Sequence, residues 1–188
     1  MSEALVFFLF GGLCVSLLVF LRRRFAGFAG QRASDYADFH PEFDMQTCLD
    51  GAMQCDGVIF GPFGRMTSSF EADFDVNWEG NTGTIDAYFR YNDGSSQKRR
   101  WTIRLDGKGG FDALADDVPG KGRGNISGCS VIFRYLIDLP PEAGGHRLSA
   151  LDCMYLAPND TVVNRSQFRK FGFKVAELVA TIKKKETA

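Results

Sequence analysis

Residues 65–78 alternate between polar and apolar side chains over fourteen consecutive positions. Every odd position is polar, and every even position except Ser68 is apolar. Successive side chains of a β-strand point to opposite faces, whereas an α-helix repeats every ~3.6 residues. The pattern therefore predicts a long strand that buries one face and exposes the other.

Alternation returns in shorter segments along the rest of the chain, and turn residues separate these segments. The Asn-Asp-Gly sequence at 92–94 is a strong hairpin signal. Segment 173–183 also fits helical spacing, and we assign it as a strand because strands precede it throughout. The further predicted strands are 85–91, 99–106, 111–117, 128–139, 147–156, 161–166 and 173–183.

Eight or nine antiparallel strands joined by short turns form a meander. A long meander closes best into a barrel, because closure removes its exposed edges. The 18 phenylalanines of the chain are enough to fill or to line such an interior. The predicted fold is therefore mainly β, an antiparallel β-barrel of eight or nine strands with one N-terminal transmembrane helix.

That helix is predicted from an uncharged apolar run at residues 4–21, which three arginines, Arg22 to Arg24, follow directly. Eighteen residues at about 1.5 Å each extend about 27 Å, close to the hydrocarbon thickness of a bilayer. All faces of the segment are equally apolar, which argues against a helix buried in a globular core. We therefore expect residues 4–24 to contact membrane lipids as a single span.

The flanks of the run predict an anchor that is not cleaved. A secretory signal carries positive charge before its apolar core and small residues after it, and this chain has the reverse order. A lipoprotein signal needs a small residue before the modified cysteine, but Leu13 precedes Cys14. Basic residues stay on the cytoplasmic side. We therefore expect a single-pass protein of the bacterial inner membrane, with its N-terminus outside and its barrel in the cytoplasm.

Three parts follow from these patterns: a membrane anchor at 1–24, a juxtamembrane linker at 25–47 and a barrel domain at 48–188. Two interpretations of the linker stay open. Phe25 and Phe28 lie at the membrane interface beside the arginines, or the linker packs loosely on the barrel. The five cysteines are odd in number and scattered, which fits a reducing compartment.

Composition and motifs exclude several classes of function. The net charge of −1 gives no electrostatic case for nucleic-acid binding. Two histidines and the isolated pair Cys48 and Cys55 do not match the ligand spacing of a metal site. Ser127 stands one place too late for a G-x-S-x-G nucleophile elbow. We therefore expect no catalytic residues, no metal and no cofactor.

Two basic segments each allow two interpretations. The stretch 120–125, Gly-Lys-Gly-Arg-Gly-Asn, is either a flexible connector between strands or a cradle for a phosphate group. It does not match the P-loop pattern, and a strand rather than a helix follows it. The stretch 98–100, Lys-Arg-Arg, with Arg104 beyond it, is either a solvated strand face or a contact with anionic lipid.

The order of several short sequences resembles a proteobacterial family of unknown function, family 3833, with a lipocalin-like (calycin-type) barrel. The matching sequences are Gly-Pro-Phe-Gly-Arg at 61–65, Trp-Glu-Gly at 78–80, Tyr-Asn-Asp-Gly at 91–94, Arg-Trp at 100–101, Asp-Asp-Val-Pro-Gly at 116–120, Gly-Asn at 124–125, Asp-Cys-Met-Tyr-Leu at 152–156, Asn-Arg-Ser at 164–166 and Lys-Phe-Gly at 170–172. The resemblance covers about residues 49–184 and implies a fold without a known activity. Many relatives resemble lipid-anchored envelope proteins, and this chain departs from them because it has a spanning helix and no lipobox.

The polar residues of these family-like sequences suggest a network at one end of the barrel. Its members would be Asp117, Asn125, Asn164, Arg165 and Lys170. A buried arginine needs a carboxylate partner, because an unpaired buried charge is very costly. From residue type alone, we predict that Asp117 and Arg165 form a buried pair that closes one end of the barrel.

Three functions from different classes compete. The first is a membrane-anchored binding module for a lipid or another apolar small molecule, since barrels of this size hold one small ligand. Its inward face would carry five aromatic residues: Phe70, Phe74, Trp78, Phe89 and Trp101. The second is a structural or accessory subunit of a membrane protein complex, with a filled barrel and no ligand. The third, an enzyme on lipid or isoprenoid-like substrates, ranks last because no catalytic constellation is visible.

Overall fold

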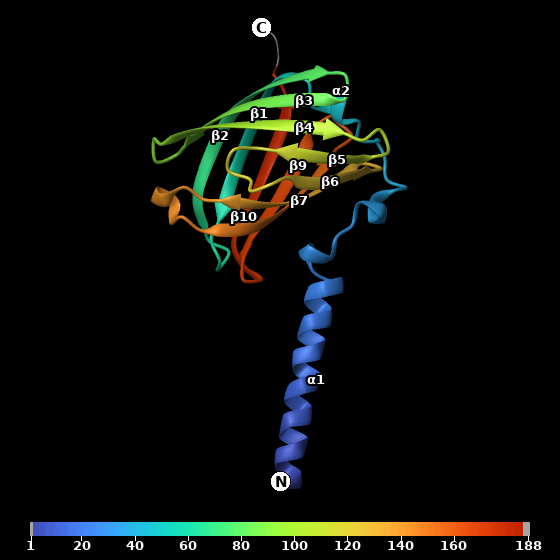
Figure 1. The fold of residues 1–188 in the computed structure, drawn as a ribbon, viewed down its shortest axis with the longest axis vertical. Helices are drawn as coiled ribbons and strands as arrows, with labels where there is room; N and C mark the ends of the chain where they lie inside the picture. Colours follow the sequence, from blue (N-terminus) through green and yellow to red (C-terminus); the bar gives the residue numbers. More distant parts are fainter. Residues whose placement is uncertain (1, 186–188) are drawn as a thin grey trace.

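Ten antiparallel strands close into one β-barrel, and a long helix extends away from it (Figure 1). The computed structural model describes residues 2–185. Residue 1 and residues 186–188, the outermost positions of the predicted anchor and barrel ranges, lie outside the described residues. The prediction of a mainly β chain with a closed antiparallel barrel and an N-terminal apolar helix is confirmed.

The chain forms its helices first and its strands afterwards, except for one short helix between two late strands. The helical elements are α1 (Glu3–Phe25), η1 (Phe28–Gly30), η2 (Ala33–Tyr36), α2 (Met45–Cys48) and η3 (Pro141–Ala143). The strands are β1 (Gly51–Phe60), β2 (Met66–Glu79), β3 (Thr82–Tyr91), β4 (Ser96–Leu105), β5 (Gly110–Leu114), β6 (Gly122–Ser127), β7 (Ser130–Asp138), β8 (Arg147–Leu156), β9 (Val162–Lys170) and β10 (Phe173–Lys184).

Each strand pairs with its neighbours in the sequence, and β1 pairs with β10 to close the barrel. Because the strands alternate in direction, the connections after β1, β3, β5, β7 and β9 lie at one end, which we call the hairpin end. The remaining connections lie at the other end with the short helix α2, and we call this the α2 end. Two hairpins, β1–β2 and β9–β10, reach toward the side from which α1 extends (Figure 1).

The predicted count of eight or nine strands is too low, because no strand was assigned over β1 or over β6. In β6, the inward positions Gly122 and Gly124 have no side chain to reveal the alternation. A Cβ at these positions would lie 2.5 Å from the Phe133 ring and 2.1 Å from the Phe111 ring. Four of the six residues at 120–125, interpreted as either a connector or a phosphate cradle, therefore belong to a strand that is held close to two aromatic rings.

The long alternating pattern and the ambiguous last segment are both resolved as predicted. On β2, the even positions Phe70, Ala72 and Val76 are buried in the barrel core. β10 is a strand, with Ala180 and Ile182 buried in the same core. A register irregularity between Lys174 and Ala176 shifts the alternation of inward and outward side chains along β10. The spacing of its apolar residues therefore resembles that of a helix.

The α2 end is closed by side chains. Met45 and Leu49 are 3% and 5% exposed and belong to the barrel core. The side chain of Asp44 caps α2 by accepting a hydrogen bond from the backbone N–H of Gln46 at 2.9 Å. The indole Nε1 of Trp78 donates to the carbonyl of Leu49 at 2.7 Å, which ties the cap to β2.

The linker lies on the outer face of the barrel. Ala33 packs with Leu151 and Cys153 in a second, smaller core outside the barrel wall. The guanidinium of Arg134 donates to the carbonyl of Gln31 at 2.8 Å, so the linker is also held by its backbone. Over residues 151–153, β8 is therefore covered on both faces, on the inner face by the barrel and on the outer face by the linker.

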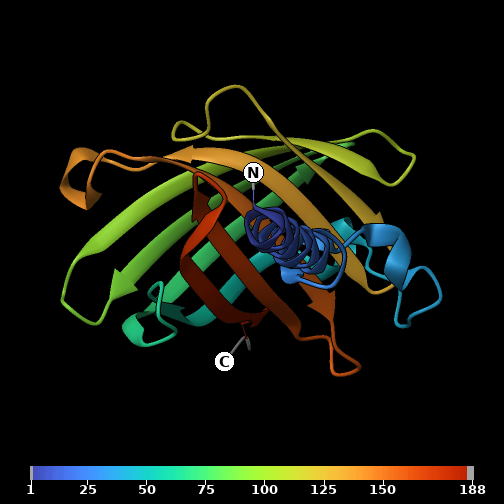
Figure 2. The ribbon, with the colours of Figure 1, turned by 90° about the horizontal axis from the view of Figure 1, so that it is seen from below.

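Helix α1 leaves the linker and points away from the barrel (Figure 1), and in the view along the helix it lies in front of the strands (Figure 2). It is long and apolar enough to cross a membrane, and none of its apolar segment Glu3–Arg22 is buried against the rest of the described chain. The helix therefore exposes a continuous apolar surface to its surroundings.

Candidate functional site

The barrel interior contains a partly open cavity of about 170 Å³. Phenylalanine, tryptophan and aliphatic side chains from all around the barrel form most of its wall, and Met45 and Leu49 close it toward the α2 end. Its polar wall residues are Arg99, Tyr135, Asp152, Asn164 and Ser166. The cavity is therefore an apolar space with polar groups gathered on one part of its wall.

Four of the five aromatic residues predicted to face a ligand line this cavity. They are Phe70, Phe74, Phe89 and Trp101. Their rings pack edge to face, with centroids 5.4 Å apart for Phe70 and Phe89 and 5.8 Å apart for Phe74 and Phe89. The fifth residue, Trp78, packs against the core at the α2 end and covers Gly83, where an added Cβ would lie 2.7 Å from its ring. Trp78 is thus part of the closure and not of the cavity wall.

A salt bridge between Arg99 and Asp117 lies at the polar part of the interior. Arg99 Nε is 3.0 Å from Asp117 Oδ2, and Arg99 Nη2 donates to Asp117 Oδ1 at 3.0 Å. The side chains are only 16% and 24% exposed. The guanidinium also lies 4.3 Å from the centre of the Trp101 ring, close enough for a cation–π interaction. Arg99 therefore has partners for its charge inside the barrel.

A second polar pair joins β7 to β8. The Tyr135 hydroxyl donates to Asp152 Oδ2 at 3.1 Å. Burial raises the pKa of the Asp152 carboxyl, and this effect outweighs the opposing hydrogen bonds from Ser166 and Tyr135 and the charge of Arg99. Asp152 Oδ1 makes no geometrically good hydrogen bond within residues 2–185. Asp152 is therefore a buried carboxyl at the cavity wall with one oxygen available to a ligand.

The interior offers little for nucleophilic or metal chemistry. The Cys55 thiol also lines the cavity, and burial and the nearby Asp56 raise its pKa to about 12, so it stays protonated and unreactive. Among the described residues, no three His, Cys, Asp or Glu side chains are placed to hold a metal ion. The geometry favours binding by shape and hydrogen bonding.

The predicted polar network does not assemble. Asp117 and Asn164 face the interior, whereas Asn125 and Arg165 lie on the outer surface, and the Lys170 ammonium lies 5.7 Å from the Phe171 ring centre at the hairpin end. Strand parity explains the division, because neighbouring positions on a strand face opposite sides. The five residues share family-like sequences but not a site.

The predicted pair of Asp117 with Arg165 is likewise wrong. Arg165 Nη2 lies 2.6 Å from Glu177 Oε1 on the outer face of β9 and β10, and Asp117 takes Arg99 as its partner. The Arg165 guanidinium also lies 4.7 Å from the centre of the Phe28 ring in the linker. Arg165 therefore supports contacts on the outer face of the barrel instead of closing its interior.

The most important residue that the sequence interpretation misplaced is Arg99. The sequence interpretation groups it with its basic neighbours, either on a solvated face or in contact with anionic lipid. Arg99 instead shares the parity of Trp101 and Ile103 and so points inward. Tyr135 and Asp152 were missed as site residues, although each stands in an otherwise apolar series of inward positions. A polar residue that interrupts an inward-facing series is the signal that identifies all three.

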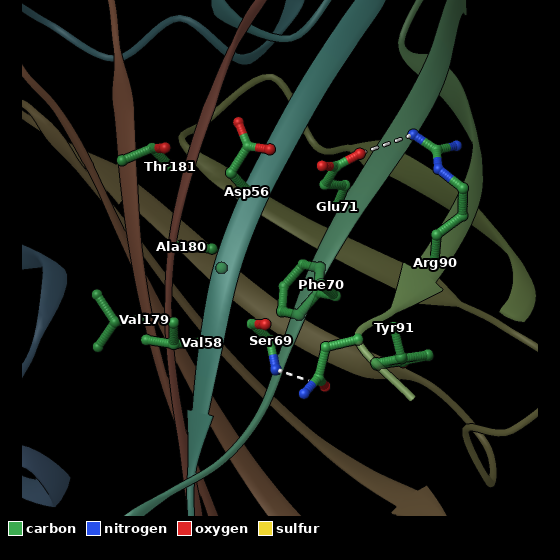
Figure 3. Close-up of a pocket in the computed structure, with 12 residues that line it drawn as sticks. Asp56, Val58, Ser69, Phe70, Glu71, Arg90, Tyr91, Val179, Ala180 and Thr181 are labelled. Atoms are coloured by element: carbon green, nitrogen blue, oxygen red, sulfur yellow. Dashed lines mark hydrogen bonds and ion pairs between the residues drawn. The ribbon is translucent and has the colours of Figure 1, made fainter. Parts of the chain in front are cut away.

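A larger hollow lies on the outer surface over β10, β1, β2 and β3, with a volume of about 700 Å³ (Figure 3). Its charged residues pair with neighbours: Glu71 Oε2 lies 3.6 Å from Arg90 Nη2, and Asp56 accepts from Gln54 at 3.1 Å. The hollow is open to solvent and its charges are already satisfied. The interior cavity is therefore the candidate site.

Comparison with known proteins supports the fold. Residues 23–184 match the family described as "Protein of unknown function (DUF3833)", which confirms the resemblance of the sequence pattern. No curated protein matches the chain.

Solved structures share the barrel at low sequence identity. The S-type phycobiliprotein lyase CPES from Guillardia theta has a TM-score of 0.61 at 9% identity, over 84% of this chain and 99% of that one. Rv2717c from M. tuberculosis has a TM-score of 0.56 at 16% identity, over 79% and 100% of the two chains. A protein of unknown function from Nostoc punctiforme, of the DUF3598 family, has a TM-score of 0.52 at 11% identity, over 78% and 51%. Such likenesses show a shared lipocalin-like barrel and leave function to be argued from the site.

Proposed function

The chain belongs to the DUF3833 family of proteins of unknown function, and from this premise we propose that its barrel binds one small, largely apolar molecule. The observation that carries the proposal is the interior cavity, apolar over most of its wall and polar at Arg99, Tyr135 and Asp152. Ligand sites are typically apolar hollows with a few convergent polar groups.

The size of the cavity limits the ligand. An apolar cavity of about 150 Å³ is known to hold benzene, and drug-sized ligands need roughly 300 Å³ or more. A cavity of about 170 Å³ therefore fits one ring or a short branched chain. The ligand is not a whole membrane lipid unless the aromatic side chains move apart.

The polar groups limit its chemistry. Arg99 is already paired with Asp117, so the cavity has no unpaired cation for a ligand carboxylate. The raised pKa of Asp152 favours its protonated form, and one of its oxygens is available for hydrogen bonding. We therefore infer a ligand with a single hydroxyl or carbonyl group, directed at Asp152, and an apolar ring or chain among the phenylalanines.

The same proposal places the barrel at a membrane. Helix α1 supplies the apolar span, and Arg22 at its barrel-proximal end favours a cytoplasmic location of the barrel by the positive-inside rule. All five cysteines are unpaired, in keeping with a reducing compartment. A bacterial inner-membrane protein with a cytosolic barrel is the arrangement that these features support, and protease accessibility in inverted membrane vesicles tests it.

The binding proposal is tested with a probe of matched size and chemistry. We would titrate the detergent-solubilised full-length chain into 4-fluorophenol and follow the fluorine NMR signal of the probe. Binding is expected to broaden and shift this signal. Ala87→Leu should abolish the effect, because Ala87 lines the cavity and a larger side chain would fill it.

A matched control separates blocked binding from damaged folding. Val163→Leu adds apolar volume on the outer face of β9, where Val163 is 36% exposed, and it should leave the probe signal as in the unmodified chain. If Ala87→Leu keeps a cooperative melting transition and still broadens the signal, the cavity is not the binding site. If the unmodified chain leaves the probe signal unchanged, the size and polarity argument fails.

One observation favours the alternative of a structural or accessory subunit. Trp101 packs edge to face against Phe133 and Tyr135, with centroids 5.4 Å and 5.3 Å apart, so aromatic rings already fill much of the interior. A filled barrel would act through its outer face or its helix. Native mass spectrometry of the extracted protein distinguishes the two: a bound small molecule supports the binding module, and an empty barrel associated with another membrane protein supports the subunit.

A further inference from the structure

Two hairpin tips carry aromatic side chains that the fold leaves in solvent. Phe63, between β1 and β2, is 93% exposed, and Phe171, between β9 and β10, is 89% exposed. Met66 and Phe173 beside them are 55% and 64% exposed. Single exposed apolar residues are ordinary, but a group of large ones on neighbouring hairpins marks an interaction surface.

The backbone holds these side chains outward. Phe171 has φ +51° and Gly172 has φ +82°, so a two-residue turn with two positive φ angles joins β9 to β10. Such turns favour Asn or Asp followed by Gly, and a bulky residue in the first position is strained. At the other tip, Gly64 at φ +77° donates its N–H to the carbonyl of Gly61 at 3.0 Å, which presents Phe63 at the apex. Strain retained at an exposed position points to a role outside folding.

The charge around the tips has one sign. Residues 60–66 and 169–174 contain Arg65, Arg169, Lys170 and Lys174 and no acidic residue. Other connections at the hairpin end differ, since β3–β4 contains Asp93 and β5–β6 contains Asp116. Aromatic side chains flanked by basic ones suit the interface of a bilayer with anionic lipids, where rings insert and ammonium and guanidinium groups meet phosphates.

The position of the tips relative to α1 identifies the partner. Figure 1 shows the β1–β2 and β9–β10 turns on the side of the barrel from which α1 extends, at about the level where the helix leaves the linker. A bilayer crossed by α1 would therefore meet these two turns first.

We propose that the β1–β2 and β9–β10 tips dock on the membrane surface, with Phe63 and Phe171 inserted in the interface and Arg65 and Lys170 contacting anionic headgroups. This second contact orients the barrel relative to the bilayer. The inference rests on the part of the proposed function that places α1 in a membrane, and it is independent of the cavity ligand.

Tryptophan quenching by brominated lipids tests the docking. The full-length chain is placed in nanodiscs of phosphatidylcholine and phosphatidylglycerol whose acyl chains are brominated near the headgroup. Phe63→Trp and Phe171→Trp should each add fluorescence that the bromines quench, beyond the baseline of the interior Trp78 and Trp101. Tyr88→Trp is the matched control. Tyr88 is 38% exposed and belongs to β3, a strand that Figure 1 shows on the side of the barrel away from α1, so its added signal should stay unquenched.

A charge reversal tests the role of the basic residues. Arg65→Glu, introduced into the Phe63→Trp chain, should reduce quenching in discs that contain phosphatidylglycerol and leave it unchanged in discs of phosphatidylcholine alone. Equal quenching of the tip and Tyr88 positions would overturn the proposal, because it would indicate unspecific lipid contact.

A further variant separates this inference from the anchor. Leu13→Trp lies in the middle of α1, so it is measured in nanodiscs whose acyl chains are brominated near their methyl ends, where it reports whether the helix enters the bilayer. Quenching at Leu13→Trp without quenching at the tips supports the anchor and overturns the docking. Quenching at the tips without quenching at Leu13→Trp supports docking by the barrel alone and removes the anchor. Quenching at neither position overturns both.

Discussion

At the α2 end of the barrel, Met45 and Leu49 are 3% and 5% exposed, whereas at the hairpin end Phe63 and Phe171 are 93% and 89% exposed. Both ends present large apolar side chains, and only one of them covers these side chains with protein. The chain closes the α2 end with its own residues: the Asp44 side chain caps α2, and the Trp78 indole donates a hydrogen bond to the Leu49 carbonyl. At the hairpin end, the proposed membrane contact would cover the side chains that the chain itself leaves exposed. The burial of apolar side chains within the chain and their proposed burial in a membrane must therefore be tested separately.

The largest effect on stability is expected from breaking the closed end. Trp78→Ala removes the ring that covers Gly83 and the hydrogen bond to the Leu49 carbonyl. Large-to-small changes of buried aromatic residues cost about 3–5 kcal/mol. Trp78 is partly buried, so the packing loss should lie near the low end of this range, and the lost hydrogen bond adds about 1 kcal/mol. Urea unfolding of the detergent-solubilised chain should show a loss of about 4 kcal/mol. Phe63→Ala, at the exposed end, is the control and should change the unfolding free energy by less than about 0.5 kcal/mol; equal losses would contradict the distinction between the ends.

The second largest effect on stability is expected from breaking the interior salt bridge between Arg99 and Asp117. Arg99→Ala leaves Asp117 without its partner in a largely buried place, and breaking one side of a buried pair costs about 3 kcal/mol. The double variant Arg99→Met with Asp117→Leu should recover most of this loss, because it removes both charges. Unfolding midpoints in urea measure both. A double variant no more stable than Arg99→Ala would show that Arg99 acts through packing on Trp101.

The pH dependence of the unfolding free energy should contain a contribution from Asp152. Because burial raises the pKa of this carboxyl in the folded state, the folded protein keeps a proton that the unfolded chain releases. The stability linked to this group is therefore present at low pH and is lost as pH rises from the ordinary carboxyl value through the raised folded value. At neutral pH, Asp152→Asn should stabilise the protein by about 2 kcal/mol, because the amide is neutral in both states and folding no longer requires the uptake of a proton.

The control for Asp152 has the opposite sign. Asp138 lies on the outer surface, where a hydrogen bond from Arg147 lowers its pKa, so its linked stability is lost as pH falls. Melting temperatures measured from about pH 4 to pH 8 should therefore flatten on the alkaline side for Asp152→Asn and on the acidic side for Asp138→Asn. An unchanged profile for Asp152→Asn would mean that the cavity keeps this carboxyl well solvated.

The smallest expected effect sharpens the comparison at the exposed end. Phe171→Asn puts a residue that tolerates positive φ at the strained turn position and should raise the unfolding free energy by up to about 1 kcal/mol. The same variant should weaken membrane contact of the tip. A loss of stability instead would show that Phe171 supports the barrel through contacts within the chain.

The architecture was largely predictable because alternation is strong wherever one face of a strand is wet. β2 shows this, with Phe70, Ala72 and Val76 inward and polar residues outward. β6 was not predicted, because Gly122 and Gly124 occupy its inward positions. In β8 the alternation of polar and apolar residues is weakened, because the linker buries Leu151 and Cys153 on the outer face. Polar and apolar residues alternate along a strand when one face is exposed to solvent and the other is buried. The pattern is weakened where both faces are covered or where a glycine replaces the inward side chain.

The candidate site was only half predictable. The aromatic wall followed from parity, which placed Phe70, Phe74 and Phe89 inside. The salt-bridge partners inside the barrel could not be predicted from parity, because they depend on which strands lie opposite each other across the interior. Sequence gives no measure of that distance, and the choice of Arg165 over Arg99 as the partner of Asp117 reflects it.

The pairing of β1 with β10 has a consequence for biosynthesis. The register joins Met53 to Lys184, so the first strand of the barrel waits for the last one before its edge is covered. Synthesis at roughly 5–20 residues per second leaves that edge unpaired for several seconds, a period in which strands aggregate or exchange between chains. An α1 segment already held at the membrane would keep nascent copies apart during this interval. The order of the chain, apolar helix first and closing strand last, suits a barrel that is completed only when its final strand emerges.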